Sequence, residues 1–474
     1  MYDHLAQSCM DDDPSDAIEF GTDGWRAAGE EFTMERVRAI GAAVAELLDA
    51  DDTDGPLAIG YDARDDSRAA AEQLGAVVAA SGRDVTLSER DCPTPVLAWT
   101  VRTGPYVGGL MVTASHNPPE YNGVKYVVSD GTPALPDVTE EIERRLAPPG
   151  PRPQDPDGEI TEADFIEAYA EHAHSFVDAD LDGLAIGYDA MHGSGRGVTD
   201  QILADAGADL TRLRCERDPT FGGVSPEPAP ENAAELTDLV DDGSVSLGLV
   251  NDGDADRLGV ITPERGFVDP NVLLAVLYEY LLDHSPAPGD VVRTVSTSSL
   301  VDQVAREAGR EVHETAVGFK WVAEAMEAHD ALAGGEESGG YGIGSHLPNK
   351  DGVVLALLLA AAHADRSLDE RIDALFEQHG NIVQSRRSLD CPDERKAAVI
   401  DGLDGTVPDR VADREVAEIQ TVDGFKIRLD DDSWILIRPS GTEPKLRVYA
   451  ESNSQDRVSE LLDAGETIVR PLLD

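Results

Sequence analysis

The sequence predicts an α/β protein with three similar mixed α/β sheet domains and a smaller C-terminal α+β domain that has an antiparallel sheet. The length of 474 residues suggests three or four domains. Short apolar runs of strand character alternate with alanine-rich helical stretches, as in βαβ units. The segment Leu-Ala-Ile-Gly-Tyr-Asp-Ala occurs at 57–63 and again at 184–190, which indicates a duplicated α/β domain.

The first two domains are separated by a segment rich in proline. Upstream of it we expect strands over 57–60 and 109–112 and a helix over 68–80. Residues 148–156 carry too many prolines for regular structure. The first domain is therefore expected at residues 1–150 and the second at 156–261, where the strand-helix alternation restarts.

The remaining sequence predicts two further domains. A third alternating segment, 262–376, contains predicted strands near 291–295 and 331–333, and its apolar run 353–362 predicts a buried helix that is too short to span a membrane. Past Gly380 the pattern changes to an α+β domain at 380–474. Its predicted elements are strands over 424–430, 433–438 and 446–451 and a closing helix from Gln455.

The charge of the chain excludes several classes of partner. Acidic residues outnumber basic ones by 93 to 38, and the net charge of −55 disfavours binding to nucleic acid or to an anionic membrane surface. Only six of the basic residues are lysines. Few lysines together with a large excess of acidic residues are typical of proteins adapted to the high-salt cytoplasm of a halophile. No secretory signal and no C-x-x-C pair is visible, so we expect a cytoplasmic protein.

The loop Thr113–Pro118 follows a predicted strand and is the first candidate for chemistry. Functional loops of α/β sheets lie beyond the carboxyl ends of strands. Ser115, beside His116 and next to an Asn-Pro turn, is suited to be a nucleophile or a phosphate carrier. The loop alone fits a plain connection between strand and turn equally well.

The loop Asp252–Arg257 carries three carboxylates at alternate positions, Asp252, Asp254 and Asp256. An EF-hand would need glycine and glutamate where this chain has Arg257 and Pro263, so that interpretation fails. A set of solvated acids is the alternative, but the flanking apolar segments favour a site for Mg²⁺.

Two loops in the second half of the chain are suited to bind a phosphorylated sugar. Gly334–Gly340 offers Glu336 and Ser338, which suit sugar hydroxyls, although it also reads as a glycine-rich turn. Arg438–Arg447 combines cations, hydroxyls and a glycine in a plausible phosphate cradle, with a basic hairpin turn as the alternative.

Together these loops resemble the α-D-phosphohexomutase family over nearly the whole chain, from Phe20 to Tyr449, in the family's order. The resemblance implies a phosphoserine at Ser115 and one Mg²⁺ held by Ser115, Asp252, Asp254 and Asp256. It implies catalytic roles near the reacting groups for Arg26, His116, Lys125 and Arg257. It implies substrate contacts from Gly318, Lys320, Glu336, Ser338, Arg438, Ser440, Gly441, Thr442 and Arg447.

The resemblance implies that a hexose 1-phosphate and a hexose 6-phosphate are interconverted through a hexose 1,6-bisphosphate, in a central cleft among the four domains, with proton transfer by His116 or Lys125. Gly340 and the Glu336-Glu337 pair favour glucose, and mannose and glucosamine are the alternatives. A non-catalytic sugar-phosphate-binding paralogue and a phosphatase are the alternative functions.

The resemblance is compatible with a monomer or a homodimer. Because three of the lysines, Lys125, Lys320 and Lys445, lie in or beside these loops, we expect a positive cleft interior despite the acidic surface.

Overall fold

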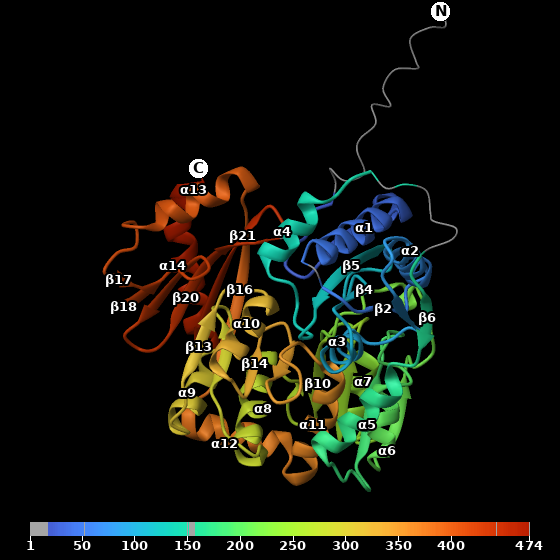
Figure 1. Cartoon of the computed structure of the whole chain (residues 1–474). Coiled ribbons are helices and arrows are strands. Elements are labelled where there is room, and N and C mark those ends of the chain that lie inside the picture. Colours follow the sequence, from blue (N-terminus) through green and yellow to red (C-terminus); the bar gives the residue numbers. More distant parts are fainter. Residues whose placement is uncertain (1–17, 52, 149, 151–156, 442, 474) are drawn as a thin grey trace, which may run out of the picture. The chain divides into compact units, whose positions relative to one another are not determined.

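The computed structural model describes residues 18–51, 53–148, 150, 157–441 and 443–473, and it divides into two compact units (Figure 1). The first unit comprises the described residues up to Ile261 together with Asn349–Ala361. The second unit comprises Thr262–Pro348 and the described residues from Ala362 onward. Most of the proline-rich segment 148–156 lies outside the described residues.

The first sheet has the strand order β1-β5-β4-β2-β3-β6. Its strands are β1 Trp25–Ala28, β2 Leu57–Tyr61, β3 Val85–Ser88, β4 Gly108–Val112, β5 Tyr121–Val128 and β6 Ile160–Ala163. Apolar side chains of α1, α2 and α4 share one core with the sheet, and α3 lies on the opposite face (Figure 1). The helices are α1 Met34–Ala50, α2 Ser67–Ala80, α3 Thr94–Thr103, α4 Pro136–Arg144 and α5 Ile166–Val177.

The second and third sheets are also mixed. The second has the order β11-β10-β9-β7-β8 and the third β13-β12-β14-β15. Their strands are β7 Ala185–Asp189, β8 Asp209–Leu213, β9 Leu247–Asn251, β10 Leu258–Thr262, β11 Gly266–Phe267, β12 Val291–Thr294, β13 Val312–Thr315, β14 Ala333–Gly335 and β15 Tyr341–Ile343. The helices of this region are α6 Thr199–Asp205, α7 Ala234–Asp241, α8 Pro270–His284, α9 Leu300–Glu307, α10 Phe319–His329, α11 Gly352–Asp365 and α12 Leu368–His379.

The first three sheets share one strand topology, which confirms the prediction of three similar α/β domains. A central strand (β2, β7 or β12) has a parallel neighbour on each side, and one of those neighbours pairs antiparallel with the next strand along the chain. The repeated seven-residue segment supplies β2 and β7, the central strands of the first two sheets. The identity therefore reflects equivalent positions in two copies of one fold.

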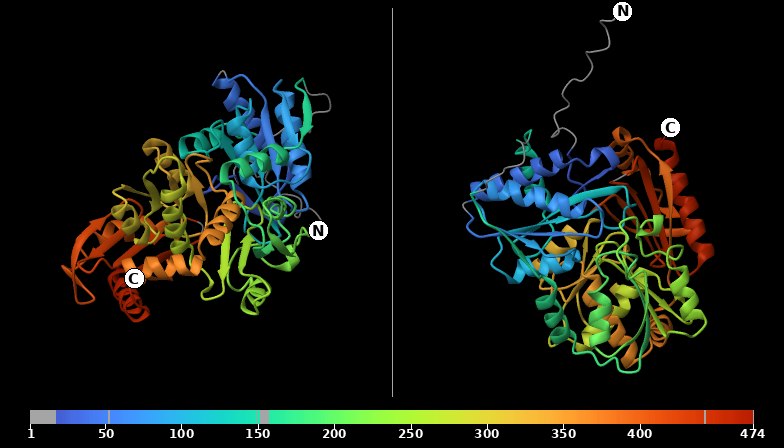
Figure 2. Two further views of the ribbon diagram at one scale, coloured as in Figure 1. Left: turned by 90° about the horizontal axis from the view of Figure 1, so that it is seen from below. Right: turned by 90° about the vertical axis from the view of Figure 1, so that its right-hand side faces the viewer.

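The C-terminal sheet is antiparallel throughout, as predicted, with the order β16-β21-β20-β19-β18-β17. Its strands are β16 Val383–Asp390, β17 Arg410–Val411, β18 Arg414–Gln420, β19 Phe425–Leu429, β20 Trp434–Pro439 and β21 Lys445–Ser452. Helices α13 Asp393–Leu403 and α14 Gln455–Leu473 pack their apolar residues into the core of this sheet (Figure 2).

One predicted strand is displaced. The sequence placed a strand at 331–333, but β14 covers Ala333–Gly335 and pairs with β15, so that two glycines expected in a loop lie in a strand. Among the described residues, none of the helices combines the length and the apolar character that crossing a bilayer requires.

Candidate active site

The loop after β4 buries Ser115 inside the first unit. Ser115 is fully buried and its backbone has a φ of 52°, a left-handed conformation that is unfavourable for a residue with a Cβ. Its backbone N–H donates to Thr113 Oγ1 at 2.8 Å, and that hydroxyl donates to Asp62 Oδ2 at 2.7 Å. The loop is thus anchored to the end of β2.

The side chain of Arg64 also holds this loop in place, a role that the sequence did not suggest. Its side chain is 2% exposed and donates to Asp62 Oδ2 through Nε at 3.0 Å. Its two terminal nitrogens donate to four backbone carbonyls of the loop, at distances of 2.7–2.9 Å, namely those of Ser115, Asn117, Pro118 and Tyr121. A planar guanidinium is suited to so many fixed acceptors.

The aspartate loop follows β9 and brings Asp252, Asp254 and Asp256 together. All three side chains are buried, and one oxygen from each lies within 4.8 Å of the others. The Oδ1 atoms of Asp254 and Asp256 accept no hydrogen bond from the described residues. Burial, together with the charges of the other two carboxylates, raises the pKa of Asp252 well above its usual value. Clustered oxygens with unused lone pairs fit a hard divalent cation.

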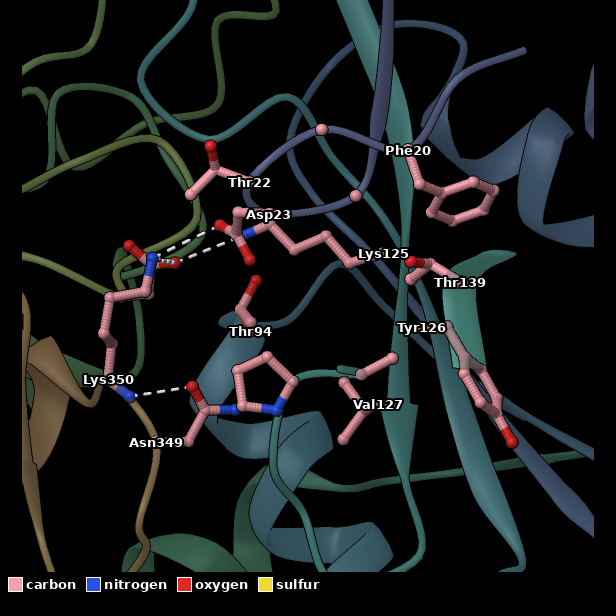
Figure 3. Close-up of a pocket in the computed structure, with 15 residues that line it drawn as sticks. Phe20, Thr22, Asp23, Thr94, Lys125, Tyr126, Val127, Thr139, Asn349 and Lys350 are labelled. Carbon is pink, nitrogen blue, oxygen red and sulfur yellow. Dashed lines mark hydrogen bonds and ion pairs between the residues drawn. The ribbon is translucent and has the colours of Figure 1, made fainter. Parts of the chain in front are cut away.

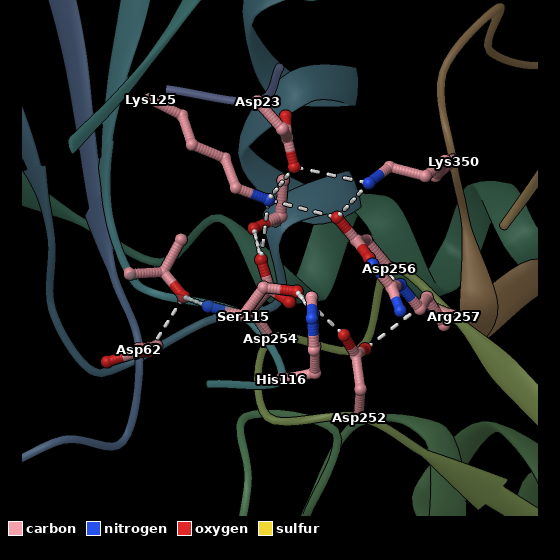
Figure 4. A network of polar contacts seen from close by, with 12 residues as sticks. Asp23, Asp62, Ser115, His116, Lys125, Asp252, Asp254, Asp256, Arg257 and Lys350 are labelled. Atoms are coloured by element: carbon pink, nitrogen blue, oxygen red, sulfur yellow. Dashed lines mark hydrogen bonds and ion pairs between the residues drawn. The ribbon is translucent and has the colours of Figure 1, made fainter. Parts of the chain in front are cut away.

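The serine loop and the aspartate loop are in direct contact (Figure 4). Ser115 Oγ donates to Asp252 Oδ2 at 2.9 Å. A Cβ on Gly253 would lie 2.6 Å from the carbonyl oxygen of Ser115, so only glycine lets the two backbones approach this closely. The structure thereby joins the predicted phosphate carrier and the predicted metal ligands in one site.

Two buried lysines lie among these carboxylates (Figure 4). Lys125 Nζ on β5 lies 2.9 Å from Asp254 Oδ2, 3.0 Å from Asp256 Oδ2 and 2.9 Å from Asp23 Oδ2. Burial opposes its charged form, but the carboxylates of Asp23, Asp254 and Asp256 outweigh burial and raise the pKa of Lys125 well above its usual value. Lys350 Nζ lies 2.9 Å from Asp256 Oδ2 and 3.2 Å from Asp23 Oδ2.

The sequence did not single out Asp23 or Lys350. Asp23 lies in the glycine-rich segment Gly21–Trp25, and Lys350 lies two residues before the first residue of the apolar helix α11. The only available signal for Lys350 was that lysines are scarce in this chain.

The other predicted groups of the first unit also surround Ser115. His116 Nδ1 lies 3.4 Å from Ser115 Oγ. The charge of Arg257, together with burial and the charge of Arg26, lowers the pKa of His116 well below its usual value. Arg26 Nη1 donates to Asn117 Oδ1 at 2.8 Å, and Arg257 Nε lies 3.9 Å from Asp256 Oδ1. These cations keep the imidazole neutral, with one unprotonated ring nitrogen, and they oppose its protonated form.

A cavity borders this network (Figure 3). Lys125, Asp23, Asp256 and Lys350 line it on its polar side. The chain's N-terminal described segment and the neighbourhood of β5 supply apolar lining at Phe20, Tyr126, Val127, Pro133 and Ala134. The charged groups Lys125, Asp23, Asp256 and Lys350 therefore border a small cavity within the first unit.

The predicted sugar-binding residues lie in the second unit. Gly318 precedes α10, and its N–H donates to Glu336 Oε1 at 3.0 Å. Lys320 lies in the first turn of α10, and Ser338 is in the turn between β14 and β15. The glycines at 334 and 335 serve packing, because a Cβ there would lie 2.4 Å from Met326 Sδ and 2.6 Å from the ring of Tyr341.

The predicted phosphate-binding residues lie in the same unit, around the end of β20. Arg438 is mostly buried and pairs with Asp423 at 2.9 Å, and Arg447 pairs with Glu443 at 2.9 Å. Lys396, which the sequence did not single out, donates to the backbone carbonyl of Ser440 at 2.6 Å and so braces the loop. Gly441 is exposed, and Thr442 lies outside the described residues.

Replacing Arg64 by lysine is expected to lower the free energy of unfolding by about 2 to 4 kcal/mol, because an ammonium cannot satisfy the same set of buried carbonyls. Thermal or urea unfolding measures this. Arg68→Lys is the matched control, since Arg68 is 45% exposed on α2 and its pairs are with surface carboxylates. Equal stability of the two variants would contradict the role given to Arg64.

Models of four phosphoglucomutase/phosphomannomutase domains match the chain in order. Alpha/beta/alpha domain I matches residues 17–149, domain II 163–266, domain III 269–379 and the C-terminal domain 390–466.

Individual relatives cover almost the whole chain. A "probable phosphoglucosamine mutase" of Methanopyrus kandleri is 34% identical over 454 residues, which cover 95% of this chain and 97% of that protein. A phosphoglucomutase/phosphomannomutase of Thermococcus kodakarensis is 30% identical over 462 residues, 96% of this chain and 99% of that protein. The crystal structure of a Thermus thermophilus protein, provisionally assigned as a phosphomannomutase, superposes with a TM-score of 0.83 at 30% identity and covers 96% of this chain and 99% of that one. The chain therefore belongs to the phosphoglucomutase/phosphomannomutase family of phosphohexomutases, and it is an isomerase of the intramolecular phosphotransferase type.

Proposed function

We propose that this protein interconverts hexose 1-phosphate and hexose 6-phosphate, and that Ser115 carries the phosphoryl group between them. The observation that supports this most strongly is the contact of a fully buried serine hydroxyl with the aspartate cluster, 2.9 Å from Asp252 Oδ2. A hydroxyl in that position is next to the groups that stabilise phosphoryl charge and is shielded from bulk water.

We propose Mg²⁺ as the cofactor, held by Ser115, Asp252, Asp254 and Asp256. The unused oxygens of Asp254 and Asp256 support this fit. When bound, the ion neutralises charge on the phosphoryl oxygens. Lys125, Arg257 and Arg26 add fixed positive charge from the protein around the same position.

The transfer step breaks the bond between Ser115 Oγ and phosphorus and forms a bond from phosphorus to a hydroxyl oxygen of the sugar. The proton of that hydroxyl moves to His116, and from there to Ser115 Oγ, which leaves as the hydroxyl. The 3.4 Å separation of His116 Nδ1 and Ser115 Oγ supports this assignment over Lys125, whose ammonium is engaged by three carboxylates. The hexose 1,6-bisphosphate then turns, and its other phosphate returns to Ser115.

The loops of the second unit are proposed to hold the sugar during both transfers. Glu336, Ser338, Gly318 and Lys320 would contact the ring hydroxyls and the phosphate near them. The non-reacting phosphate would bind at the loop that follows β20, through Arg438, Ser440, Gly441, Thr442 and Arg447. We propose four domains with boundaries at 1–150, 156–261, 262–376 and 380–474, of which the last opens and closes over the substrate.

Glucose phosphate is the first candidate for the substrate, on the basis of Gly340 in the sugar loop. Glucosamine phosphate is the second candidate, because the Methanopyrus kandleri relative bears that name. The other sequence argument for glucose is weaker in the structure. Glu337 accepts from Thr294 Oγ1 at 3.2 Å and Glu336 accepts from the Gly318 amide, so both acidic side chains have partners within the protein.

Ser115→Ala is expected to lower the exchange between glucose 1-phosphate and glucose 6-phosphate by at least about a thousandfold, because the phosphoryl carrier is gone. Ser81→Ala, which removes a hydroxyl that caps the end of α2, is the matched control. Intact-mass analysis of the wild-type protein should show a fraction with one added phosphoryl group that maps to Ser115. Near-normal turnover by the Ser115 variant would refute the mechanism.

Removal of divalent metal is expected to abolish exchange, and addition of Mg²⁺ to restore it, since the aspartate cluster cannot by itself neutralise a phosphoryl group. In direct binding measurements Asp254→Asn should weaken Mg²⁺ affinity by about tenfold or more, as loss of a charged ligand does. Asp242→Asn, at an exposed carboxylate, is the control. Full turnover in rigorously metal-free buffer would contradict the proposed cofactor.

A comparison of glucose, mannose and glucosamine 1-phosphates at high KCl identifies the sugar. We expect the highest kcat/KM with glucose 1-phosphate. A tenfold or larger preference for glucosamine 1-phosphate would establish the second candidate instead, while leaving the roles of Ser115 and the aspartates unchanged.

A further inference from the structure

Asp423, in the turn between β18 and β19, links the two substrate loops of the second unit. One of its oxygens, Oδ2, accepts from Arg438 Nη2 at 2.9 Å and from Arg438 Nε at 3.2 Å. The same oxygen accepts from the backbone N–H of Val317 at 3.0 Å. The carboxylate is 19% exposed, so these three contacts are made largely out of water.

The contact with Val317 continues into the sugar loop. Val317 directly precedes Gly318, whose own N–H donates to Glu336 Oε1 at 3.0 Å. Two consecutive amides are thus fixed by carboxylates from two different loops, just before α10 begins with Lys320 in its first turn. A continuous polar path therefore runs from Arg438 through Asp423 and the 317–318 backbone to Glu336.

The turn that carries Asp423 is fitted closely to Arg438. Gly424 has a φ of +88°, and a Cβ there would lie 2.5 Å from the carbonyl oxygen of Ile437 and 2.6 Å from Arg438 Cβ. Only glycine allows the turn to lie this close, and the close approach is what brings the carboxylate of Asp423 to the guanidinium.

Further contacts near this turn join the C-terminal sheet to the third sheet. Lys426, on β19 just after the turn, donates to the carbonyl of Val295 at 2.8 Å and to Glu314 Oε2 at 2.7 Å. Val295 also joins Trp434 in a small buried apolar cluster against which Val317 packs. The contact between Asp423 and Val317 is therefore one of several contacts that hold the C-terminal sheet against the third sheet.

We propose that Asp423 is a positioning residue for substrate binding. Its carboxylate orients the guanidinium of Arg438 toward the phosphate that stays on the sugar, and it sets the 317–318 backbone at the same time. The inference rests on the proposed roles of these loops in holding a hexose phosphate. Asp423 engages Nε and Nη2 of a group that has five N–H donors, so one edge of the guanidinium is held by the protein while the group as a whole can still serve an anion.

The test is Asp423→Asn, which keeps an oxygen acceptor for the Val317 amide and removes the charge that orients Arg438. We expect KM for glucose 1-phosphate to rise about tenfold while kcat stays within about twofold, because the lost interaction contributes equally to substrate and transition-state binding. A merely structural role would lower the active fraction, and therefore kcat, with KM unchanged. Asp423→Glu keeps the carboxylate and should recover part of the loss in KM.

Asp430→Asn is the matched control. It removes the same charge from the other end of β19, where the carboxylate is 43% exposed and lies 4.0 Å from its nearest cation, Arg414. We expect wild-type KM and kcat from this variant. An equal rise in KM in both variants would overturn the inference, because it would show a general effect of charge on anion binding.

A binding measurement separates this inference from the proposed function. Calorimetry with glucose 6-phosphate on Ser115→Ala, with and without Asp423→Asn, requires no turnover, and we expect Kd to rise about tenfold in the double variant. If the wild-type protein catalyses no exchange but Kd still rises, the proposed function fails and the role of Asp423 stands. An unchanged Kd, or no binding of glucose 6-phosphate to Ser115→Ala, overturns the inference about Asp423.

Discussion

The chemistry that we propose for the first unit depends on the backbone of Ser115 being held in a left-handed conformation. That conformation costs about 1 kcal/mol for a residue with a Cβ, and it would relax in an unsupported loop. Two groups at the end of β2 prevent this: Asp62, which accepts from Thr113, and Arg64, whose guanidinium engages the loop carbonyls. With the loop fixed, the hydroxyl of Ser115 is directed at Asp252 rather than into the turn.

The fold could be predicted from the sequence, and the candidate loops could be located in it, because both have local signatures. Short apolar runs located β2 and β4, and the seven-residue repeat located equivalent strands, β2 and β7, in two domains. Ser115 and the three aspartates follow strands directly, so their place at the edge of a sheet could be inferred from position alone. The displaced strand β14 shows the limit of this approach, because its glycines are there to fit against Met326 and Tyr341, side chains that only the folded structure brings close.

The residues that the sequence did not reveal act over long distances along the chain. Arg64 supports a loop more than fifty positions away, and Lys350 reaches Asp23 across more than three hundred. Asp423 lies in an ordinary Asp-Gly turn, whose pattern predicts a turn and gives no hint of a contact with Val317. Such partners carry no local spacing rule, since only tertiary packing decides which buried charge meets which.

The sequence suggested a positively charged interior, but around Ser115 the structure places as many acidic as basic side chains. Around Ser115 the cations Arg26, Lys125, Arg257 and Lys350 are matched by the carboxylates of Asp23, Asp252, Asp254 and Asp256. In the proposed function, the positive character that binds a phosphosugar is therefore supplied by the proposed divalent cation together with the side chains. The large negative charge of the chain, −55, is carried mainly by other residues and does not decide the charge at this site.

The return of the chain from the second unit to the first, at Asn349–Ala361, has a consequence for the order in which the protein is made. The serine loop and the aspartate loop both precede residue 260 in the chain. Lys350, which contacts Asp256 and Asp23, follows all four strands of the third sheet and is therefore synthesised after them. The first half of the chain can begin to fold on its own during translation, yet its charge network is complete only later. An amino-terminal fragment that ends at the second sheet would therefore contain Ser115, the proposed phosphoryl carrier, without the full set of charges that surrounds it.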